Sequence, residues 1–159
     1  MKRTVTIVML LCAIFIGGTI AEAKTTKKKA KSSSVIAKIK INDRGSVTLY
    51  SNGKAKFPHE CSGDWKKRGN QIYYLTVDGG EGYEMDVIIG NTVYRIHAGS
   101  TGGFEDIDYN PTNKTITFKD FWDGDEEYFL ERYNLSSFTV STDKFGSIFP
   151  KVGTVTWTK

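Results

Sequence analysis

Cysteine, histidine and proline are scarce in this chain of 159 residues. It contains two cysteines, Cys12 and Cys61, two histidines, His59 and His97, and three prolines. Cys12 lies in an N-terminal apolar run that we expect to be removed. That would leave Cys61 as the only cysteine of the mature chain and exclude an intramolecular disulfide. We therefore expect a hydrophobic core to stabilise the domain, with a large contribution from aromatic residues, which make up 13% of the sequence.

The same scarcity restricts the possible chemistry. A zinc site needs three or four Cys or His ligands, often at short fixed spacing, and Cys61, His59 and His97 are not spaced in that way. His59 and Cys61 lie two residues apart, but Pro58 before them favours a loop histidine beside a half-buried thiol over a catalytic pair. No nucleophile with a base and an orienting group is evident. We expect a protein that is not an enzyme and that uses no cofactor or metal.

No apolar stretch is long enough to cross a membrane. An apolar run over residues 7–16 follows Lys2 and Arg3, and the small-x-small sequence Ala-Glu-Ala ends at Ala23. This pattern predicts a secretory signal peptide over residues 1–23 with cleavage after its last residue. The cysteine in the run lacks a small residue before it, so we expect no lipid anchor. The protein would then be exported, to the periplasm or out of the cell.

A basic excess is also absent from the part of the chain that we expect to fold. The formal net charge is +4, but residues 35–159 contain 15 Lys and Arg against 17 Asp and Glu, a net charge of −2. Because nucleic-acid binding requires a basic face on the domain, we expect no nucleic-acid partner. Much of the positive charge lies in residues 24–34, KTTKKKAKSSS, whose composition predicts a disordered linker. A tether to anionic lipid or polysaccharide is the alternative.

What the sequence does contain is a succession of short alternating runs joined by tight turns. Asn52-Gly53 lies between two such runs, which is a strong hairpin signal. Similar runs flank residues 67–70, Gly90-Asn91 and residues 110–113. No segment has a convincing helical period, although residues 141–149 are compatible with a single helical turn. The candidate strands cover residues 35–41, 46–50, 54–57, 63–67, 71–77, 84–89, 92–98, 104–109, 115–119, 127–133, 135–142 and 152–158.

These runs predict one all-β domain over residues 35–159, an antiparallel meander of about nine to eleven strands. An up-and-down barrel is the preferred arrangement, because closure removes the exposed edges of a long open sheet. A two-sheet β-sandwich is the alternative.

Part of this meander resembles a known family. Gly63-Asp64-Trp65, followed by Gly69-Asn70-Gln71-Ile72, resembles the G-x-W strand and hairpin of lipocalin-like (calycin-type) domains of small secreted bacterial proteins. The resemblance covers residues 47–77. It implies a barrel with an interior cavity for a small apolar ligand and no catalysis. Arg132 or Arg95 would take the place of the arginine that packs across the tryptophan, but no T-D-Y run follows near the middle of the chain.

Two further segments have an unusual composition. Residues 120–127 contain five carboxylates, which calcium would accept as ligands, but their spacing favours a solvated acidic loop. Residues 99–103 are rich in glycine but precede no expected helix. They therefore lack the helix N-terminus that a phosphate-binding loop needs.

Aromatic residues supply the candidate binding site. Most lie within alternating runs and are expected in the core. Trp122 differs, because it follows Phe121 in the acidic segment, where it would anchor a sugar ring or a protein partner, or fold back to close a barrel end. The candidate ligand-binding residues are Trp65, Tyr74, Tyr94, Trp122 and Tyr128.

We therefore expect an exported, monomeric, non-enzymatic β-barrel domain that binds a small apolar or amphipathic ligand in its interior. The alternative is a surface-binding β-sandwich, an adhesin or inhibitor that contacts a glycan or a protein partner through Trp122 and the acidic loop.

Overall fold

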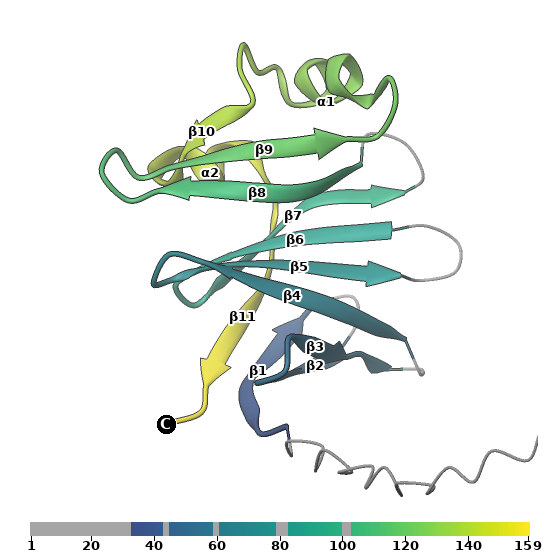
Figure 1. The fold of residues 1–159 in the computed structure, drawn as a ribbon, viewed down its shortest axis with the longest axis vertical. Coiled ribbons are helices and arrows are strands. Elements are labelled where there is room, and N and C mark those ends of the chain that lie inside the picture. The colour runs from purple at the N-terminus through teal and green to yellow at the C-terminus, as the bar shows by residue number, and fades with distance from the viewer. Residues whose placement is uncertain (1–32, 43–44, 59–60, 79–82, 100–102) are drawn as a thin grey trace, which may run out of the picture. The chain divides into compact units, whose positions relative to one another are not determined.

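Eight antiparallel strands close into a barrel in the computed structural model of this protein, and a three-stranded sheet lies against one side of the barrel (Figure 1). The structure describes residues 33–42, 45–58, 61–78, 83–99 and 103–159. The predicted signal peptide, most of the predicted linker, and His59 lie outside the described residues.

The barrel confirms the expected antiparallel meander. Asn52 and Gly53 form the turn between its second and third strands, and Gly53 has φ 84°, a conformation that glycine adopts without a steric penalty. The first and last strands are neighbours, with Lys38 paired to Thr156. The order around the barrel is β1 (Val35–Ile41), β11 (Lys151–Trp157), β7 (Thr92–Gly99), β6 (Tyr83–Ile89), β5 (Ile72–Asp78), β4 (Ser62–Arg68), β3 (Lys54–Lys56) and β2 (Gly45–Tyr50).

The remaining elements follow β7 in sequence and precede β11. Strands β8 (Phe104–Asn110), β9 (Thr115–Phe121) and β10 (Thr139–Ser141) form the separate sheet, in the order β10-β9-β8. Helix α1 (Asp125–Tyr133) follows β9. The short helices η2 (Thr142–Lys144) and α2 (Phe145–Ile148) lead into β11, which confirms the helical turn expected in this region. Among the described residues no helix is long and apolar enough to span a membrane.

Two of the expected strands were wrong. Residues 127–133 belong to helix α1, and of residues 135–142 only Thr139–Ser141 form a strand. The helix has three acidic residues in its first turn, where they stabilise the positive end of its dipole, and it ends at Asn134 in the left-handed conformation. Phe129 and Tyr133, one turn apart, pack with ring centroids 5.2 Å apart. This spacing matches a helix better than the alternation inferred from Glu-Tyr-Phe-Leu.

The barrel interior is filled with aliphatic side chains. The alternating pattern of β1, with Ala37, Ile39 and Ile41 buried and Lys38 and Lys40 exposed, shows how each strand contributes. The buried residues of the interior core are no more than 5% exposed. They are Ala37, Ile39, Ile41, Val47, Leu49, Ala55, Phe57, Leu75, Val77, Ile88, Val93 and Val155.

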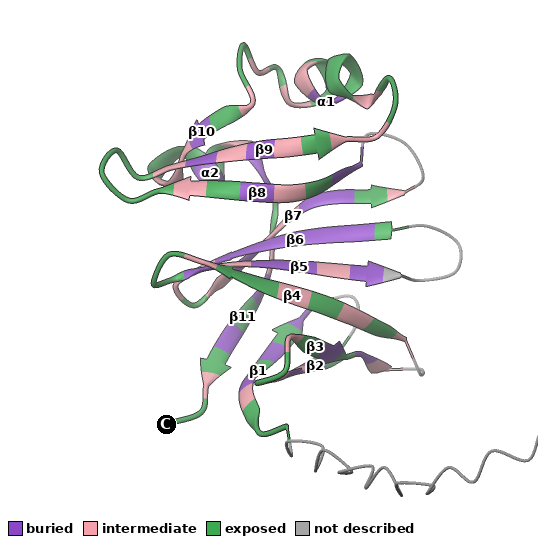
Figure 2. Ribbon diagram, in the orientation of Figure 1, coloured by how far each residue is buried: buried purple, intermediate pink, exposed green. Residues whose placement is uncertain are grey.

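A second core lies between the outer wall of the barrel and the added sheet. Strands β5 and β6 contribute to both cores, and Figure 2 shows β6 buried along almost its whole length. On the outer wall Tyr74 and Met85 meet aromatic rings from the sheet and the helices, including Phe104, Phe118 and Phe129. Five rings of this core surround Phe118 and Phe129 at centroid distances of 4.9–6.2 Å. Each such pair contributes roughly 0.5–1.5 kcal/mol beyond the burial of its area.

Polar contacts between β4 and β8 join the barrel to the sheet. The Arg68 guanidinium donates to both Asp106 carboxylate oxygens, at 2.6 and 2.5 Å, and its Nε donates to the Ile107 carbonyl at 2.8 Å. Lys66 lies 3.5 Å from the same carboxylate. Partial burial alone would raise the pKa of Asp106. The hydrogen bonds from the Ile107 N–H and from Arg68, together with the charges of Arg68 and Lys66, outweigh that effect and hold the pKa below its usual value.

Asp106→Asn should lower the free energy of unfolding at neutral pH by about 1–3 kcal/mol, because it removes a carboxylate that accepts two charged hydrogen bonds. A carboxylate whose pKa is lowered by folding adds stability above its unfolded pKa, and the contribution is lost as pH falls through the folded value. The difference between wild type and variant should therefore shrink as the pH falls below about 3.9, the usual pKa of an aspartate, in urea unfolding curves followed by circular dichroism.

Asp108→Asn is the matched control. Asp108 lies on the same strand and pairs with Lys119 at 2.9 Å, but its side chain is 64% exposed. Its replacement should have little effect on stability. Equal losses in the two variants would show that the Arg68–Asp106 contact does not hold the sheet to the barrel.

Candidate functional site

A groove of about 750 Å³ is bounded by strands β3–β6 of the barrel on one side and by β8 with Trp122 on the other. This volume lies within the roughly 300–1,000 Å³ of small-molecule sites. The residues that line the groove are Lys54, Ala55, Ser62, Gly63, Asp64, Thr76, Val77, Tyr83, Met85, Phe104, Glu105 and Trp122.

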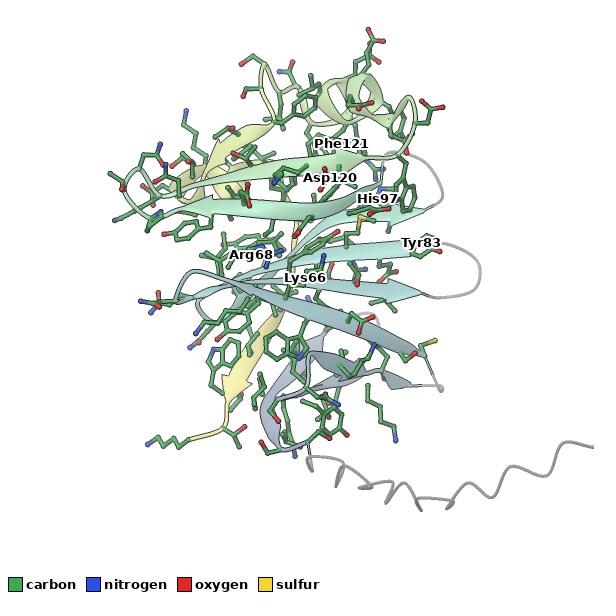
Figure 3. All side chains as sticks on the ribbon, viewed as in Figure 1. Lys66, Arg68, Tyr83, His97, Asp120 and Phe121 are labelled. Atoms are coloured by element: carbon green, nitrogen blue, oxygen red, sulfur yellow. The ribbon has the colours of Figure 1, made fainter. Side chains whose placement is uncertain are left out.

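One end of the groove is apolar and aromatic. Tyr83, at the start of β6, meets Trp122 edge to face with ring centroids 5.1 Å apart, and it remains 44% exposed. Met85 and Phe104 lie behind them, and the Phe104 N–H donates to the Met85 sulfur at 3.5 Å. Figure 3 shows Tyr83 and His97 at the same side of the molecule, on the neighbouring strands β6 and β7. A partly exposed aromatic pair over a buried apolar floor suits the apolar part of a ligand.

The start of helix α1 fixes the position of Trp122. The Trp122 N–H donates to the Gly103 carbonyl at 3.1 Å, and the Gly103 N–H donates to the Asp125 carboxylate at 3.1 Å. The Asp125 N–H in turn donates to the Trp122 carbonyl at 2.9 Å. The indole ring lies so close to Gly103 that a Cβ atom there would fall 2.4 Å from it. Trp122 is therefore held by both its backbone and its ring.

The other end of the groove carries charge. Lys54 and Asp64 form a pair at 2.5 Å, with side chains 64% and 57% exposed. Glu105 and the hydroxyl of Thr76, which donates to the Asp64 carbonyl at 3.3 Å, complete the polar lining with Ser62. Exposed ion pairs contribute little to stability, so Lys54 and Asp64 are available to contact a ligand's polar group.

His97 lies beneath this site. It is 2% exposed, its ring centroid is 6.2 Å from that of Trp122, and its Nε2 is 3.1 Å from the Gly99 carbonyl. Burial lowers the pKa of His97, and the charge of Arg132 lowers it further. The Gly99 carbonyl and the Asp125 and Glu84 carboxylates act in the opposite direction but do not outweigh burial. The imidazole is therefore neutral at physiological pH and donates to the Gly99 carbonyl.

A buried ion group lies on the inward side of β6 and β7. Arg95 Nε donates to Asp86 at 3.0 Å, and its guanidinium is 3.2 Å from Glu84. Asp86 is 1% exposed. The sequence analysis missed this group, although Glu84 and Asp86 alternate with Ile88 on one face of a strand, a pattern that places two acids inside the barrel.

The five sequence-predicted residues lie in separate places. Only Trp122 lines the groove. Tyr74 is buried and donates its hydroxyl to the Phe104 carbonyl at 2.9 Å, directly behind the groove. Tyr94 packs against a ring of helix α2, and Trp65 packs 5.6 Å from Tyr73. Tyr128 is 44% exposed on helix α1. Tyr83, Met85 and Phe104 also line the groove. Met85 and Phe104 were missed because they lie in expected strands, and Tyr83 because it lies just before the expected strand 84–89.

The acidic segment has a structural explanation. Three of its carboxylates, Asp125, Glu126 and Glu127, form the first turn of helix α1. Among the residues that the structure describes, no group of three or more His, Cys, Asp or Glu side chains is arranged to hold a metal ion.

Comparisons with protein-family models, with curated protein sequences and with solved structures found no match to this chain.

Protonation of His97 should destabilise the fold. Because its folded pKa is below its unfolded value of about 6.5, stability is lost as pH falls through this range. Urea unfolding at about pH 7.5 and pH 5.5 should show a loss in wild type that is smaller in His97→Gln. His59→Gln is the control, since the chain has only two histidines. The same reduction in the His59 variant would show that His97 is not the source.

Gly103→Ala should displace Trp122, because the added methyl group would fall 2.4 Å from the indole ring. We expect a loss of about 1–3 kcal/mol in the free energy of unfolding. Gly146→Ala is the matched control: its Cβ would meet Tyr94 at 3.6 Å, an ordinary contact, within helix α2. Alanine there should leave stability unchanged or raise it. Thermal unfolding measures both, and an unaffected Gly103 variant would show that Trp122 is not held as described.

Proposed function

We propose that this protein is a non-enzymatic, exported β-barrel domain that binds a small amphipathic ligand, and that the ligand lies in the groove beside the barrel. The observation that carries the proposal is the groove itself. Tyr83, Met85, Phe104 and Trp122 offer an apolar end, and Lys54 and other charged residues offer a polar end. Export rests on the predicted signal peptide.

The groove is a better site than the barrel interior. The interior core residues are at most 5% exposed and fall into one packed cluster. The ion pair of Asp86 and Arg95 also lies on the inward side of the barrel wall. A ligand in the interior would have to displace packed side chains or break this ion pair, at a cost of several kcal/mol. A ligand in the groove would leave these packed side chains and the Asp86–Arg95 ion pair in place.

The polar end of the groove matches the head group of an amphipathic molecule. Lys54 and Asp64 are both more than half exposed and paired only with each other among the described residues. An anionic head group would pair with Lys54, while the chain of the ligand would lie against Tyr83 and Met85. In this arrangement the apolar end supplies most of the affinity and the polar end fixes the orientation of the ligand, as in many small-molecule sites.

The lipocalin-like resemblance belongs to the same proposal. The closed eight-stranded antiparallel barrel is consistent with it. Trp65 on β4 packs against Tyr73, which packs against Trp157, at the edge of the interior core. The Trp65 indole N–H donates to the Tyr50 carbonyl at 2.9 Å. Membership of the calycin type is our inference from the G-x-W hairpin and this barrel.

A glycan is the second candidate for the same site. Tyr83 and Trp122 offer aromatic faces and edges, and Asp64 and Glu105 offer carboxylates that accept hydrogen bonds from hydroxyl groups. The surface-binding function predicted for Trp122 would then use the groove. A protein partner that contacts Tyr83 and Trp122 is a variant of this candidate.

Titration with an environment-sensitive fluorescent fatty acid tests the proposal. We expect saturable binding with one site per chain. Tyr83→Ala and Trp122→Ala should each weaken it by about tenfold, because each removes roughly 1–2 kcal/mol of apolar contact.

Tyr128→Ala is the matched control, since Tyr128 and Tyr83 are both 44% exposed but only Tyr83 lines the groove. Its binding should stay within about twofold of wild type. Binding that survives both groove substitutions would place the ligand elsewhere. Binding of oligosaccharides and not of the fatty acid, with the same dependence on Trp122, would favour the glycan.

A further inference from the structure

The barrel wall that lies away from the β8–β10 sheet has a charge pattern that the groove does not explain. Strands β11, β1, β2 and β3 are neighbours in the barrel, and Figure 1 shows them at the opposite end of the molecule from helix α1. Their sequences, KVGTVTW, VIAKIKI, GSVTLY and KAK, contain five lysines and no Asp or Glu. The charged residues of these four adjacent strands are therefore all lysines, of which only Lys54 belongs to the groove.

The interior core fixes which way these lysines point. Lys38 and Lys40 alternate with the buried Ala37, Ile39 and Ile41, so they must face solvent. Lys56 has the same relation to the buried Ala55 on β3. A one-residue slip of either strand would put lysine into the core, so the fold keeps the three ammonium groups on the outer wall.

Strand register arranges the lysines in a regular array. Lys38 is paired with Thr48, and Thr48 is paired with Lys56 on the next strand. Lys40 is paired with Ser46. Lys38 and Lys56 are thus two strands apart, about 10 Å, and Lys38 and Lys40 are two residues apart along one strand, about 7 Å. Hydroxyl groups lie between the charges.

These lysines are not used within the described fold. No ion pair joins Lys38, Lys40 or Lys56 to a carboxylate of the residues that the structure describes. Acidic side chains gather instead on β8 and in the first turn of α1. A domain with charge separated in this way presents its basic wall to a polyanion and keeps its acidic side away.

We propose that the basic wall, defined as Lys38, Lys40 and Lys56 with the hydroxyls of Ser46 and Thr48, is a binding site for a linear anionic polysaccharide. Ammonium and hydroxyl groups at regular spacing contact both the charged groups and the hydroxyls of such a chain.

The wall fits a polysaccharide better than a bilayer. Surfaces that bind anionic membranes usually combine basic residues with apolar side chains that enter the interface. The large hydrophobic residues exposed among the described residues are Val35, Tyr83 and Tyr128, and only Val35, at the first position of β1, lies near the wall. Five more lysines within residues 24–31 precede β1 in the sequence and would add to the attraction of any polyanion.

Binding of fluorescein-labelled heparin to the purified protein, followed by anisotropy at several salt concentrations, tests the proposal. The double variant Lys38→Glu/Lys56→Glu should bind at least about tenfold more weakly, with the slope of log affinity against log salt reduced by roughly two. The control Lys114→Glu/Lys144→Glu makes the same charge change at two exposed lysines of the β8–β10 side. It should bind within about twofold of wild type.

Each other outcome would overturn the proposal. Equal losses of heparin affinity in the two double variants would show that binding depends only on the net charge of the protein. Unchanged heparin affinity in the wall variant would show that other lysines bind heparin. Tighter binding to phosphatidylglycerol vesicles than to heparin, lost in the wall variant, would make the partner a membrane. Concentration-dependent association in sedimentation, lost in the same variant without heparin binding, would make it a second copy. The fatty-acid titration, repeated on both variants, keeps a failure of the wall separate from a failure of the groove.

Discussion

The outer faces of β5, β6 and β7 are as apolar as the faces that fill the barrel, and the rest of the chain is arranged around that constraint. Ile72, Tyr74, Met85 and Val87 all point away from the interior yet are at most 3% exposed. Leaving this wall in water would cost roughly 1.5–3 kcal/mol for each large side chain. The chain between β7 and β11 therefore covers it, with three strands, helix α1 and a set of packed aromatic rings.

The groove forms where this cover ends. Within β8, Asp106 contacts Arg68 of the barrel, and the Phe104 carbonyl accepts from the Tyr74 hydroxyl of β5. Phe104 and Glu105 line the groove, and Tyr83 and Trp122 are left partly exposed beside buried neighbours. A site of this kind needs no opening in the barrel. It follows from covering a wide apolar wall with a narrower sheet.

Much of the barrel could be predicted from local sequence patterns, because alternation and tight turns such as Asn52-Gly53 act over a few residues. The run Ile72-Tyr73-Tyr74-Leu75 of β5 is apolar on both faces, which is typical of a strand that is covered on both sides. Which segment covers β5 could not be predicted from neighbouring residues. The contact of Arg68 with Asp106, which joins the covering sheet to the barrel, is between residues 38 apart in sequence. Helix α1 was missed although its acidic first turn and Asn134 are helix signals, since a doubled aromatic within a short run imitates a strand.

The candidate site was predictable only in part, for the same reason. Trp122 was found because it lies outside any strand pattern. Tyr83 and Met85 belong to a regular strand, and only the position of β8 makes them part of a groove. Asp86 and Arg95 are charged residues at inward positions, where the alternation pattern leads one to expect apolar residues. Their ion pair forms only because the register of β6 and β7 brings them together, and that register cannot be seen in either strand alone.

The position of β11 has a consequence for biosynthesis. The last strand lies between β1 and β7, and the Thr158 hydroxyl donates to the Val35 carbonyl across 123 residues of chain. The barrel therefore stays open, with β1 and β7 each lacking one neighbour, until β11 has been synthesised. Contacts this distant in sequence also form slowly. Until then the edges of β1 and β7 are unpaired, and unpaired strand edges are open to pairing with other chains.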